Sequence, residues 1–472
     1  MEANKDMRIL IAGGSVAGLS LAIMLEKFGI DYLILEAYSE MAPQLGASIG
    51  MLPNGLQILD QLGCYDRLRE IGGDVYYKSS MRASDGRILT ETKGTSLSER
   101  VEEKTGYPCV FIDRQMLLQV LYEKIQHKER VLTGKRVVHV EFDEAGVTVK
   151  TKDGSTYSGD ILVGADGVRS TVRQEMWRLA ADESPGAFPP NEAESLNSRT
   201  KCIFGISNQP KGWRGMQHSV FYDGRSYLLV PGPEGRVYWF FFHVMDRDYY
   251  GKDIPRFSKE DEAKLAFKHL DDAISDTIKF RDIYEGRRFS TLVALEEHVF
   301  SRWHYRRIVL IGDSAHKLHP ITAQGGNGAL ETAAVLTNAL IAKLRSSQHK
   351  LSEDEIESVL AEVQAGRIDN ITAAMKEGRW SNAIVCQQLP LAELLIRIVI
   401  PWLGDGLMFN SWVKAFEKGT RVKALDVPQR VVGKLSHGKA DSQSQARNWA
   451  KWVSGAAISG LAAFMIMRLR KI

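Results

Sequence analysis

The chain has 472 residues, of which 44% are hydrophobic and 25% are charged, and its formal net charge is +3 at pH 7. This composition is typical of a globular protein with room for two or three domains, and it excludes an intrinsically disordered chain. The net charge is small and no basic stripe with interleaved aromatic residues is present, so we expect no nucleic-acid partner. The four cysteines lie far apart without a C-x-x-C spacing, which predicts neither a metal site nor a disulfide framework. Residues 1–6 lack the apolar stretch of a signal peptide, so we expect no cleaved signal and a cytosolic main body.

The first predicted unit is a strand, a glycine turn, a helix and a second strand. An apolar strand at 9–12 leads into the turn GGSVAG, and a helix at 19–28 leads into a strand at 32–35. In such a unit the free amide groups at the helix N-terminus face the place where a pyrophosphate binds. The order of these elements therefore predicts a dinucleotide site.

Individual residues of this unit support the same prediction. Gly13 allows the tight turn, and Gly18 lets the helix pack close to the sheet. Ser15 occupies the position of the middle glycine and is small enough for close approach to the backbone. Glu36, about 20 residues beyond the turn, is placed to accept hydrogen bonds from a ribose. Turns of this kind also occur outside nucleotide-binding proteins, so the motif alone leaves that alternative open.

Two further segments follow in the first half of the chain. The small-residue loop 43–50 can let a planar ring approach the backbone, or it is an ordinary turn into the helix expected at 56–63. Asp113 and Arg114 open a helical stretch at 115–125, where the arginine either reaches a phosphate or ribose or forms a solvated ion pair.

A buried strand then ends in a second glycine motif. Residues 137–151 alternate as a strand pair, and the strand 161–163 runs into the sequence GADGVRS. The glycines permit close passage of the backbone, Asp166 can accept hydrogen bonds in a groove, and Ser170 can cap the following helix. The Asp-Gly pair is equally compatible with a simple turn.

The middle of the chain predicts an antiparallel sheet. Residues 179–199 have the composition of a linker or an exposed loop, and short strand-like segments follow it. Their aromatic side chains suit one wall of an apolar pocket, although aromatic residues in strands are more often core residues. The expected strands are 202–206, 217–222, 226–230 and 236–243.

The chain then returns to the first sheet. The strand 307–311 is followed by GDSAH, Pro320 and a second glycine group that opens an alanine-rich helix. The amide groups of this helix can hold partial negative charge on a bound ring, and Asp313 can reach a ribityl or ribose hydroxyl. His316 and His319 lack a partner set for catalysis or metal binding, so we interpret them as structural or cofactor-proximal.

Two apolar segments lie near the C-terminus. Residues 389–412 are apolar but interrupted by charges and a proline, which indicates an amphipathic surface or lid. Residues 452–467 carry no charge and are flanked by Lys451 and by Arg468, Arg470 and Lys471. This second segment is typical of a membrane anchor, with a buried terminal helix as the alternative.

These motifs together resemble those of group A FAD-dependent monooxygenases, which have the aromatic-hydroxylase fold. The pieces that carry the resemblance are GGSVAG with Glu36, Asp113 with Arg114, GADGVRS, and GDSAH followed by Pro320 and GGN. The similarity extends over roughly Met7 to Leu344. The C-terminal region is similar to a fungal branch of this family that includes the paxilline-pathway and meroterpenoid epoxidases.

The resemblance implies an α/β fold. It consists of a Rossmann-type FAD-binding domain with an inserted antiparallel β-sheet substrate domain, C-terminal helices and a membrane anchor. The implied boundaries are 1–185 and 296–345 for the FAD-binding domain, 186–295 for the substrate domain, 346–448 for the helices and 449–472 for the anchor. FAD contacts are expected from Gly13, Ser15, Gly18, Glu36, Gly50 or its neighbour Ala47, Arg114, Asp313 and Gly326, with Asp166 lining the cofactor groove.

The same resemblance implies a reaction. In this family FAD is reduced by NADPH or NADH and adds dioxygen at its C4a position, and the hydroperoxide transfers one oxygen to an alkene or an electron-rich arene. No protein nucleophile is needed, and a proton donor near the distal oxygen is expected at Tyr222, followed by Arg225 and Tyr227 in the substrate sheet.

The membrane segment favours an apolar substrate. We therefore expect epoxidation of a prenyl-chain alkene in a terpenoid, meroterpenoid or indole diterpene intermediate, on the endoplasmic reticulum membrane, before a separate terpene cyclase acts. The alternatives are hydroxylation of a phenolic polyketide ring, reduction of a prenyl chain on the same fold, and a lipid-binding escort that has lost FAD.

Overall fold

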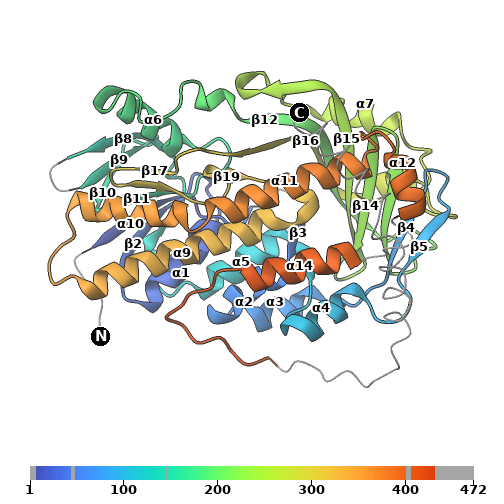
Figure 1. The fold of residues 1–472 in the computed structure, drawn as a ribbon, viewed down its shortest axis with the longest axis horizontal. Coiled ribbons are helices and arrows are strands. Elements are labelled where there is room, and N and C mark those ends of the chain that lie inside the picture. The colour runs from blue at the N-terminus through green and yellow to red at the C-terminus, as the bar shows by residue number, and fades with distance from the viewer. Residues whose placement is uncertain (1–6, 44–47, 144–145, 400–405, 431–472) are drawn as a thin grey trace, which may run out of the picture. The chain divides into compact units, whose positions relative to one another are not determined.

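A computed structural model describes residues 7–43, 48–143, 146–399 and 406–430 (Figure 1). The chain divides into two compact units, Met1–Arg430 and Val431–Ile472. The elements described below all belong to the first unit. The anchor expected at 452–467 lies outside the described residues.

The first sheet has six strands in the order β17-β18-β11-β1-β2-β7. All neighbours are parallel except β17 and β18. The side chains of β11 are buried throughout, which is typical of a parallel strand covered on both faces. The strands are β1 (Arg8–Ala12), β2 (Asp31–Leu35), β7 (Val131–Leu132), β11 (Ile161–Gly164), β17 (His304–Tyr305) and β18 (Ile308–Leu310).

Because these strands are parallel, the segments that follow them meet at one edge. Ala12 is paired with Leu35 on one side and with Gly164 on the other, and Gly164 is paired with Leu310. The glycine turn, Glu36, the GADG turn and the GDS turn therefore leave the sheet side by side, where α/β proteins bind their ligands.

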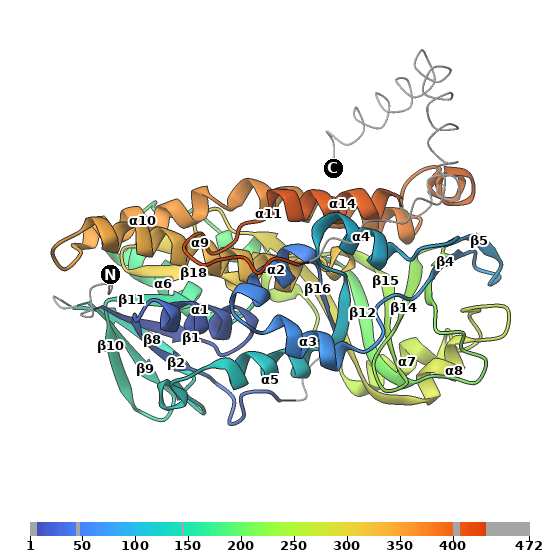
Figure 2. The same cartoon turned by 90° about the horizontal axis from the view of Figure 1, so that it is seen from below.

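Helices cover both faces of this sheet (Figure 2). On one face α1 (Val16–Lys27) is buried at every residue from Val16 to Leu25, and α9 (Gln324–Ser346) shares its core cluster. On the other face α6 (Thr171–Glu183) packs with a three-stranded sheet. The remaining helices around the first sheet are α2 (Pro53–Gln61), α3 (Tyr65–Gly72), α4 (Leu97–Thr105), α5 (Arg114–Lys124) and α10 (Glu353–Ala365), and the small sheet consists of β8 (Val137–Phe142), β9 (Val147–Thr151) and β10 (Thr156–Gly159).

The second large sheet has eight strands in the order β19-β16-β12-β15-β14-β13-β4-β5. It is antiparallel except for the parallel pair β13 and β4. The helices α7 (Lys259–Phe267) and α8 (Phe280–Glu285) cover one face. The strands are β4 (Ser79–Arg82), β5 (Ile88–Glu91), β12 (Asn197–Asn208), β13 (Gln217–Tyr222), β14 (Arg225–Pro231), β15 (Arg236–Tyr250), β16 (Arg287–Val299) and β19 (His316–Lys317).

Some elements differ from those expected. The second sheet recruits β4, β5 and β19 from outside 186–295, because strand pairing does not follow chain order. The linker expected at 179–199 is shorter, since α6 continues to Glu183 and β12 begins at Asn197. After α10 the chain continues as α11 (Ile368–Val385), α12 (Ala392–Leu394), a π-helical turn (Leu395–Val399) and α14 (Gly406–Lys418).

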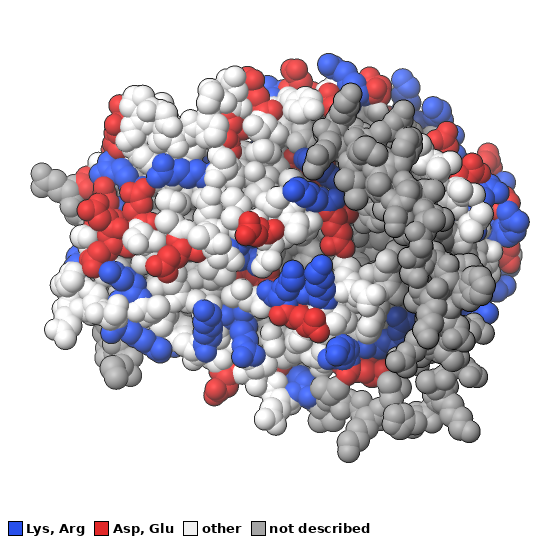
Figure 3. All heavy atoms as spheres, viewed as in Figure 1, with Lys and Arg blue, Asp and Glu red and all other residues white. Residues whose placement is uncertain are grey.

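In the described ranges, no helix is both long and apolar enough to cross a membrane. On the described part of the face in Figure 3, acidic and basic side chains are interspersed.

Candidate active site

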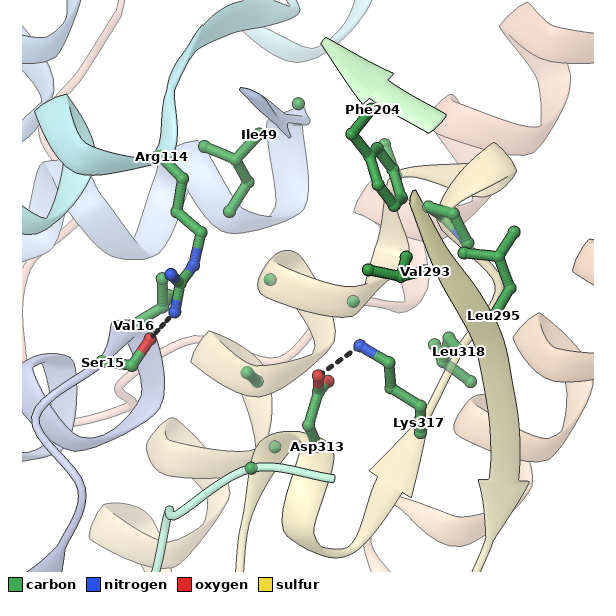
Figure 4. Close-up of a pocket in the computed structure, with 18 of the residues that line it drawn as sticks. Ser15, Val16, Ile49, Arg114, Phe204, Val293, Leu295, Asp313, Lys317 and Leu318 are labelled. Atoms are coloured by element: carbon green, nitrogen blue, oxygen red, sulfur yellow. Dashed lines mark hydrogen bonds and ion pairs between the residues drawn. The ribbon is translucent and has the colours of Figure 1, made fainter. Parts of the chain in front are cut away.

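A cavity of about 760 Å³ lies between the carboxyl edge of the first sheet and the second sheet. Its polar side is formed by the glycine turn before α1, the end of β2, and the N-terminus of α9. Its other side is formed by strands of the second sheet, among them β12 and β16, as Figure 4 shows. The two domains expected from the sequence therefore share one site.

The glycine turn requires glycine at two positions. Gly13 has a φ of +105°, and a Cβ atom there would lie 2.4 Å from the carbonyl oxygen of Ala165. A Cβ atom at Gly18 would lie 2.0 Å from the carbonyl oxygen of Gly13. The N-cap residue of α1, Ser15, makes no side-chain cap, so the first amide groups of this helix remain available to an anion in the cavity.

Replacing Gly13 with alanine is expected to destabilise the fold. The strained φ and the overlap with the backbone of Ala165 together should lower the free energy of unfolding by about 2–4 kcal/mol. Gly29→Ala is the matched control, because Gly29 also has a positive φ (+67°) but has no atom within 4 Å of the added Cβ. Thermal unfolding of both variants measures the difference, and equal destabilisation would contradict the close approach at Gly13.

Glu36 stands at the end of β2 and is only 8% exposed. Its Oε2 accepts a hydrogen bond from the backbone N–H of Gly14 at 2.6 Å, and its Oε1 accepts one from that of Tyr38 at 2.8 Å. A carboxylate can accept about four hydrogen bonds, so two lone pairs remain for hydroxyl groups of a ligand. The two backbone contacts fix the carboxylate in the cavity wall.

Arg114, at the start of α5, reaches the same helix N-terminus. Its Nη2 donates to Ser15 Oγ at 2.6 Å (Figure 4). Burial lowers the pKa of this guanidinium, while Asp313 is the largest influence that raises it. An arginine side chain stays charged at physiological pH even when it is buried. The cation of Arg114 and the open amide groups of α1 therefore lie together where the sequence predicts a pyrophosphate.

Asp166 lines the cavity, but both oxygens of its carboxylate accept hydrogen bonds from other groups of the protein. One oxygen accepts from the backbone N–H groups of Thr171 and Val172 at 2.7 and 3.1 Å, which caps α6. The other accepts from Ser314 Oγ at 3.2 Å, and the same hydroxyl accepts from the N–H of Gly167. Asp166 therefore joins the GADG turn to the GDS turn and shapes the groove.

Asp313 projects into the cavity from the GDS turn and is paired with Lys317. Lys317 Nζ lies 2.5 Å from Asp313 Oδ2, and Figure 4 shows the lysine reaching from β19 toward the carboxylate. Both side chains are about one-third exposed. Sequence reasoning assigned no role to Lys317, although it directly follows the GDSAH motif.

The N-terminus of α9 forms a narrow slot with β3 (Ser48–Met51). A Cβ atom at Gly326 would lie 2.7 Å from Ile49 Cδ1, and one at Gly50 would lie 2.8 Å from the ring of Phe111. The N-cap residue of α9, Ala323, carries no side-chain cap, so the helix amides are also open here. This geometry fits a flat ring with partial negative charge.

Asn327 holds this slot together. Its Nδ2 donates to the carbonyl oxygens of Gly50 and Ala323 at 3.0 and 2.6 Å, and its Oδ1 accepts from the N–H of Leu52 at 3.1 Å. Asn327 is fully buried. The sequence signal was the GGN triplet, but its asparagine had no assigned role.

The second sheet supplies an apolar wall. Side chains alternate across the sheet, so Phe240 and Phe242 belong to one core cluster and Trp239 and Phe241 to the cluster on the opposite face, with α7 and α8. The wall also contains polar side chains, namely Gln217, Ser219 and Ser226. Its apolar members are Phe204, Phe221, Leu228, Phe240, Phe242, Val293 and Leu295.

The structure corrects the prediction for Tyr222 and Arg225, because neither residue lines the cavity. Phe221 faces the cavity, so the next residue, Tyr222, points to the opposite face, where its hydroxyl donates to the carbonyl oxygen of Ala273 at 3.1 Å. Arg225 forms a two-pronged ion pair with Asp272 at 2.8 and 3.0 Å on that face. These two residues stabilise the packing of the sheet against the α7 and α8 side, whereas Tyr227 lines the cavity.

The other predicted residues are placed as follows. Gly18 lies inside the packed turn and does not line the cavity, whereas Ala47 lies outside the described residues. His316 is fully buried, contacts Thr332 Oγ1 through Nε2 at 2.9 Å, and has its pKa lowered to about 3 by burial. His319 is also buried, and burial lowers its pKa to about 3. Burial thus disfavours the charged form of both imidazoles.

The cavity fits a dinucleotide that ends in a flat ring. Two open helix N-termini face it, Glu36 and Asp313 offer acceptors for hydroxyl groups, and Arg114 offers a cation. Among the described residues, no group of His, Cys, Asp and Glu side chains is arranged to hold a metal ion.

Comparisons with known proteins agree with this geometry. Residues 6–358 match a family model described as "FAD binding domain". The chain is 39% identical over 404 residues to the FAD-dependent monooxygenase olcE of Penicillium canescens, covering 85% of this chain and 86% of that protein. It is 40% identical over 409 residues to the FAD-dependent monooxygenase spyC of Aspergillus fumigatus, with coverage of 86% and 85%.

A solved structure shares the fold. HpxO of Klebsiella pneumoniae, complexed with FAD and uric acid, superposes with a TM-score of 0.67 at 24% sequence identity, covering 88% of this chain and 97% of that chain. The family model matches three-quarters of the sequence, and the two fungal relatives match most of it. This chain therefore belongs to the FAD-binding family and is a group A FAD-dependent monooxygenase.

Proposed function

We propose that this monooxygenase uses NADPH or NADH and dioxygen to epoxidise a prenyl-chain alkene of a terpenoid, meroterpenoid or indole diterpene intermediate. One oxygen atom bridges the two alkene carbons. The other leaves as water, with two electrons from the reduced nicotinamide and two protons, one from the nicotinamide hydride and one from solvent. Bound FAD supplies the oxygen-activating chemistry.

The observation that carries this proposal is the apolar wall of the cavity. An alkene offers no hydrogen-bonding groups, so it can be held only by shape and apolar contact. The rings of Phe240 and Phe242 are parallel within 9°, with centroids 6.0 Å apart, and Phe204 meets Phe240 edge-on at 5.4 Å. These packed rings are suited to orienting a flexible chain and excluding water beside the cofactor slot.

The polar residues of the cavity are suited to binding the cofactor and to shaping its slot. Glu36, Arg114 and Asp313 are suited to binding the cofactor, and Asn327 keeps its slot in shape. Lys317 forms an ion pair with Asp313. We expect this ion pair to open when a hydroxyl group of the cofactor donates a hydrogen bond to the Asp313 carboxylate.

The proposal includes a cellular setting. An apolar substrate dissolves in lipid, and residues 449–472 have the sequence of a membrane anchor with flanking cations. We propose anchoring in the endoplasmic reticulum membrane, a cytosolic catalytic body, and a downstream terpene cyclase that opens the epoxide.

The test is the mass of the product. Membranes containing the full chain receive NADPH, air and a farnesylated phenolic acid, with the unprenylated acid as the control substrate. The expected result is a gain of one oxygen on the prenyl chain and no product from the control. Oxygen on the ring of the control substrate would instead establish an aromatic hydroxylase.

Two other outcomes would contradict the proposal in different ways. A product that gains two hydrogens without oxygen consumption would indicate a prenyl-chain reductase. Protein that purifies without flavin and cannot be reconstituted would indicate a lipid-binding escort. Parallel reactions with NADH determine which nicotinamide is preferred.

A further inference from the structure

Large apolar side chains are exposed in the segment that follows α11. Leu391, Leu394 and Ile398 are 56%, 50% and 62% exposed. Leu394 and Ile398 are four residues apart in α12 and the π-helical turn, and Leu391 is the N-cap residue of α12. Two residues on the opposite face, Ala392 and Ile396, are 1% and 2% exposed. The segment is therefore amphipathic, and part of its apolar surface points to solvent.

This outward face lies directly behind the cavity wall. Ile396 belongs to the same core cluster as Phe221 and Val385, and both of these side chains line the cavity. The side chain of Ile396 thus lies between solvent and the apolar wall of the cavity.

The helix α14 continues this arrangement. Leu407 is 54% exposed, while its neighbour Met408 and Trp412 line the cavity. Lys414 and Lys418 are exposed on later turns of the same helix. In Figures 1 and 2, α12 and α14 lie on the side of the molecule that carries α9, α10 and α11.

We propose that Leu391, Leu394, Ile398 and Leu407, together called the apolar rim, rest in the interfacial layer of a lipid bilayer. The exposed charges of α12, the π-helical turn and α14 are Arg397, Lys414 and Lys418 against Glu393 and Glu417, so cations are in slight excess beside the apolar side chains. Apolar side chains flanked by cations are the composition of an interfacial helix that binds anionic lipid. The placement also brings the apolar wall of the cavity next to the phase that dissolves the substrate. This inference rests on the proposed function, because it assumes a lipid-soluble substrate.

The remainder of the chain favours lipid as the occupant over a protein partner. Beyond Arg430 the sequence carries seven lysines and arginines against a single aspartate, and it includes the uncharged segment 452–467. Arg430 lies against Gly106 at the end of α4, and α4 also packs against α14. Tyr107, next to Gly106, contacts Phe416 in the last turn of α14. The chain therefore leaves the described part beside the C-terminal end of α14, and about 20 further residues, at most about 70 Å when extended, precede the uncharged segment.

The experiment places an environment-sensitive fluorophore on the rim of the full-length protein. Ile398→Cys is labelled with nitrobenzoxadiazole, and Val138→Cys is the control, because Val138 is 44% exposed on β8, at the opposite end of the first unit. The four native cysteines are buried, so labelling is selective. Vesicles of phosphatidylcholine with phosphatidylserine are then added.

The expected result is a blue shift and a several-fold rise in emission at position 398, with no change at position 138. A label at 398 that stays aqueous while the protein sediments with the vesicles would overturn the proposal, as would equal responses at both positions. A label already shielded without lipid, in protein that sediments as a dimer, would show that a second copy covers the rim.

A functional variant separates this inference from the proposed reaction. Leu394→Asp/Ile398→Asp is expected to lower the rate on a farnesylated phenolic acid presented in vesicles several-fold, and to leave the rate on detergent-dispersed substrate unchanged. Val138→Asp should change neither rate. Equal rates for the rim variant in both presentations would overturn the rim assignment, whereas absence of epoxide in detergent with the unaltered chain would overturn the proposed function.

Discussion

Glu36→Ala protein is expected to lose most of its FAD during purification, and its Kd for FAD should rise at least about 100-fold. The carboxylate is buried and held by the backbone N–H groups of Gly14 and Tyr38, so its remaining lone pairs face the cavity. Hydrogen bonds to an ionised group contribute about 1.5–3 kcal/mol each, and about 1.4 kcal/mol is tenfold in affinity. Two ribose hydroxyls therefore account for the expected loss.

Flavin fluorescence titration of apoprotein measures this Kd. Glu40→Ala is the control, because Glu40 is exposed, lies four residues further on and does not line the cavity. An unchanged Kd in the Glu36 variant would mean that the cofactor does not bind along the edge of the first sheet.

Arg367→Met is expected to lower the free energy of unfolding by about 3–5 kcal/mol, since it leaves a buried carboxylate without its cation. Arg367 is 1% exposed and its Nη1 lies 2.5 Å from Oε2 of Glu331, which is 6% exposed. Glu331 also accepts from Asn54 Nδ2 at 3.0 Å. Glu331 lies on α9, which forms the cofactor slot at its N-terminus, and Arg367 is the N-cap residue of α11, so FAD affinity should fall as well.

Denaturant unfolding of the apoprotein measures the loss of folding stability without the contribution of bound FAD. Arg67→Met removes an exposed ion pair with Glu70 and should cost less than about 1 kcal/mol. The double variant Arg367→Met/Glu331→Met removes both buried charges and is expected to regain at least part of the lost stability. A single variant no less stable than the Arg67 control would show that the buried pair makes no net contribution.

The cofactor side of the site could be predicted because it depends on local chain order. Gly13, Glu36 and Asp313 each follow a strand of the first sheet, whose parallel strands bring such positions to one edge, and Arg114 stands at the start of α5. The predicted contacts of these residues with the cofactor itself remain predictions.

The substrate side could not be predicted in the same way. Successive residues of a strand face opposite sides, so Tyr222 was placed one residue away from the side chain that reaches the cavity, Phe221. Asp166 was expected in the groove, but its bond to Ser314 depends on packing between distant segments. Asn327 acquires its role only when β3 and α9 come together, whereas Lys317 pairs with Asp313 four residues earlier in the chain.

The origin of the oxygen in the product decides whether this enzyme inserts an oxygen atom from dioxygen into a prenyl chain. The full chain in membranes, supplied with NADPH and a farnesylated phenolic acid, is given isotopically heavy dioxygen in ordinary water, and then ordinary dioxygen in heavy-oxygen water. We predict one heavy atom per product, on the prenyl chain, in the first reaction and none in the second. A product labelled from water, or labelled on the aromatic ring, would contradict this prediction.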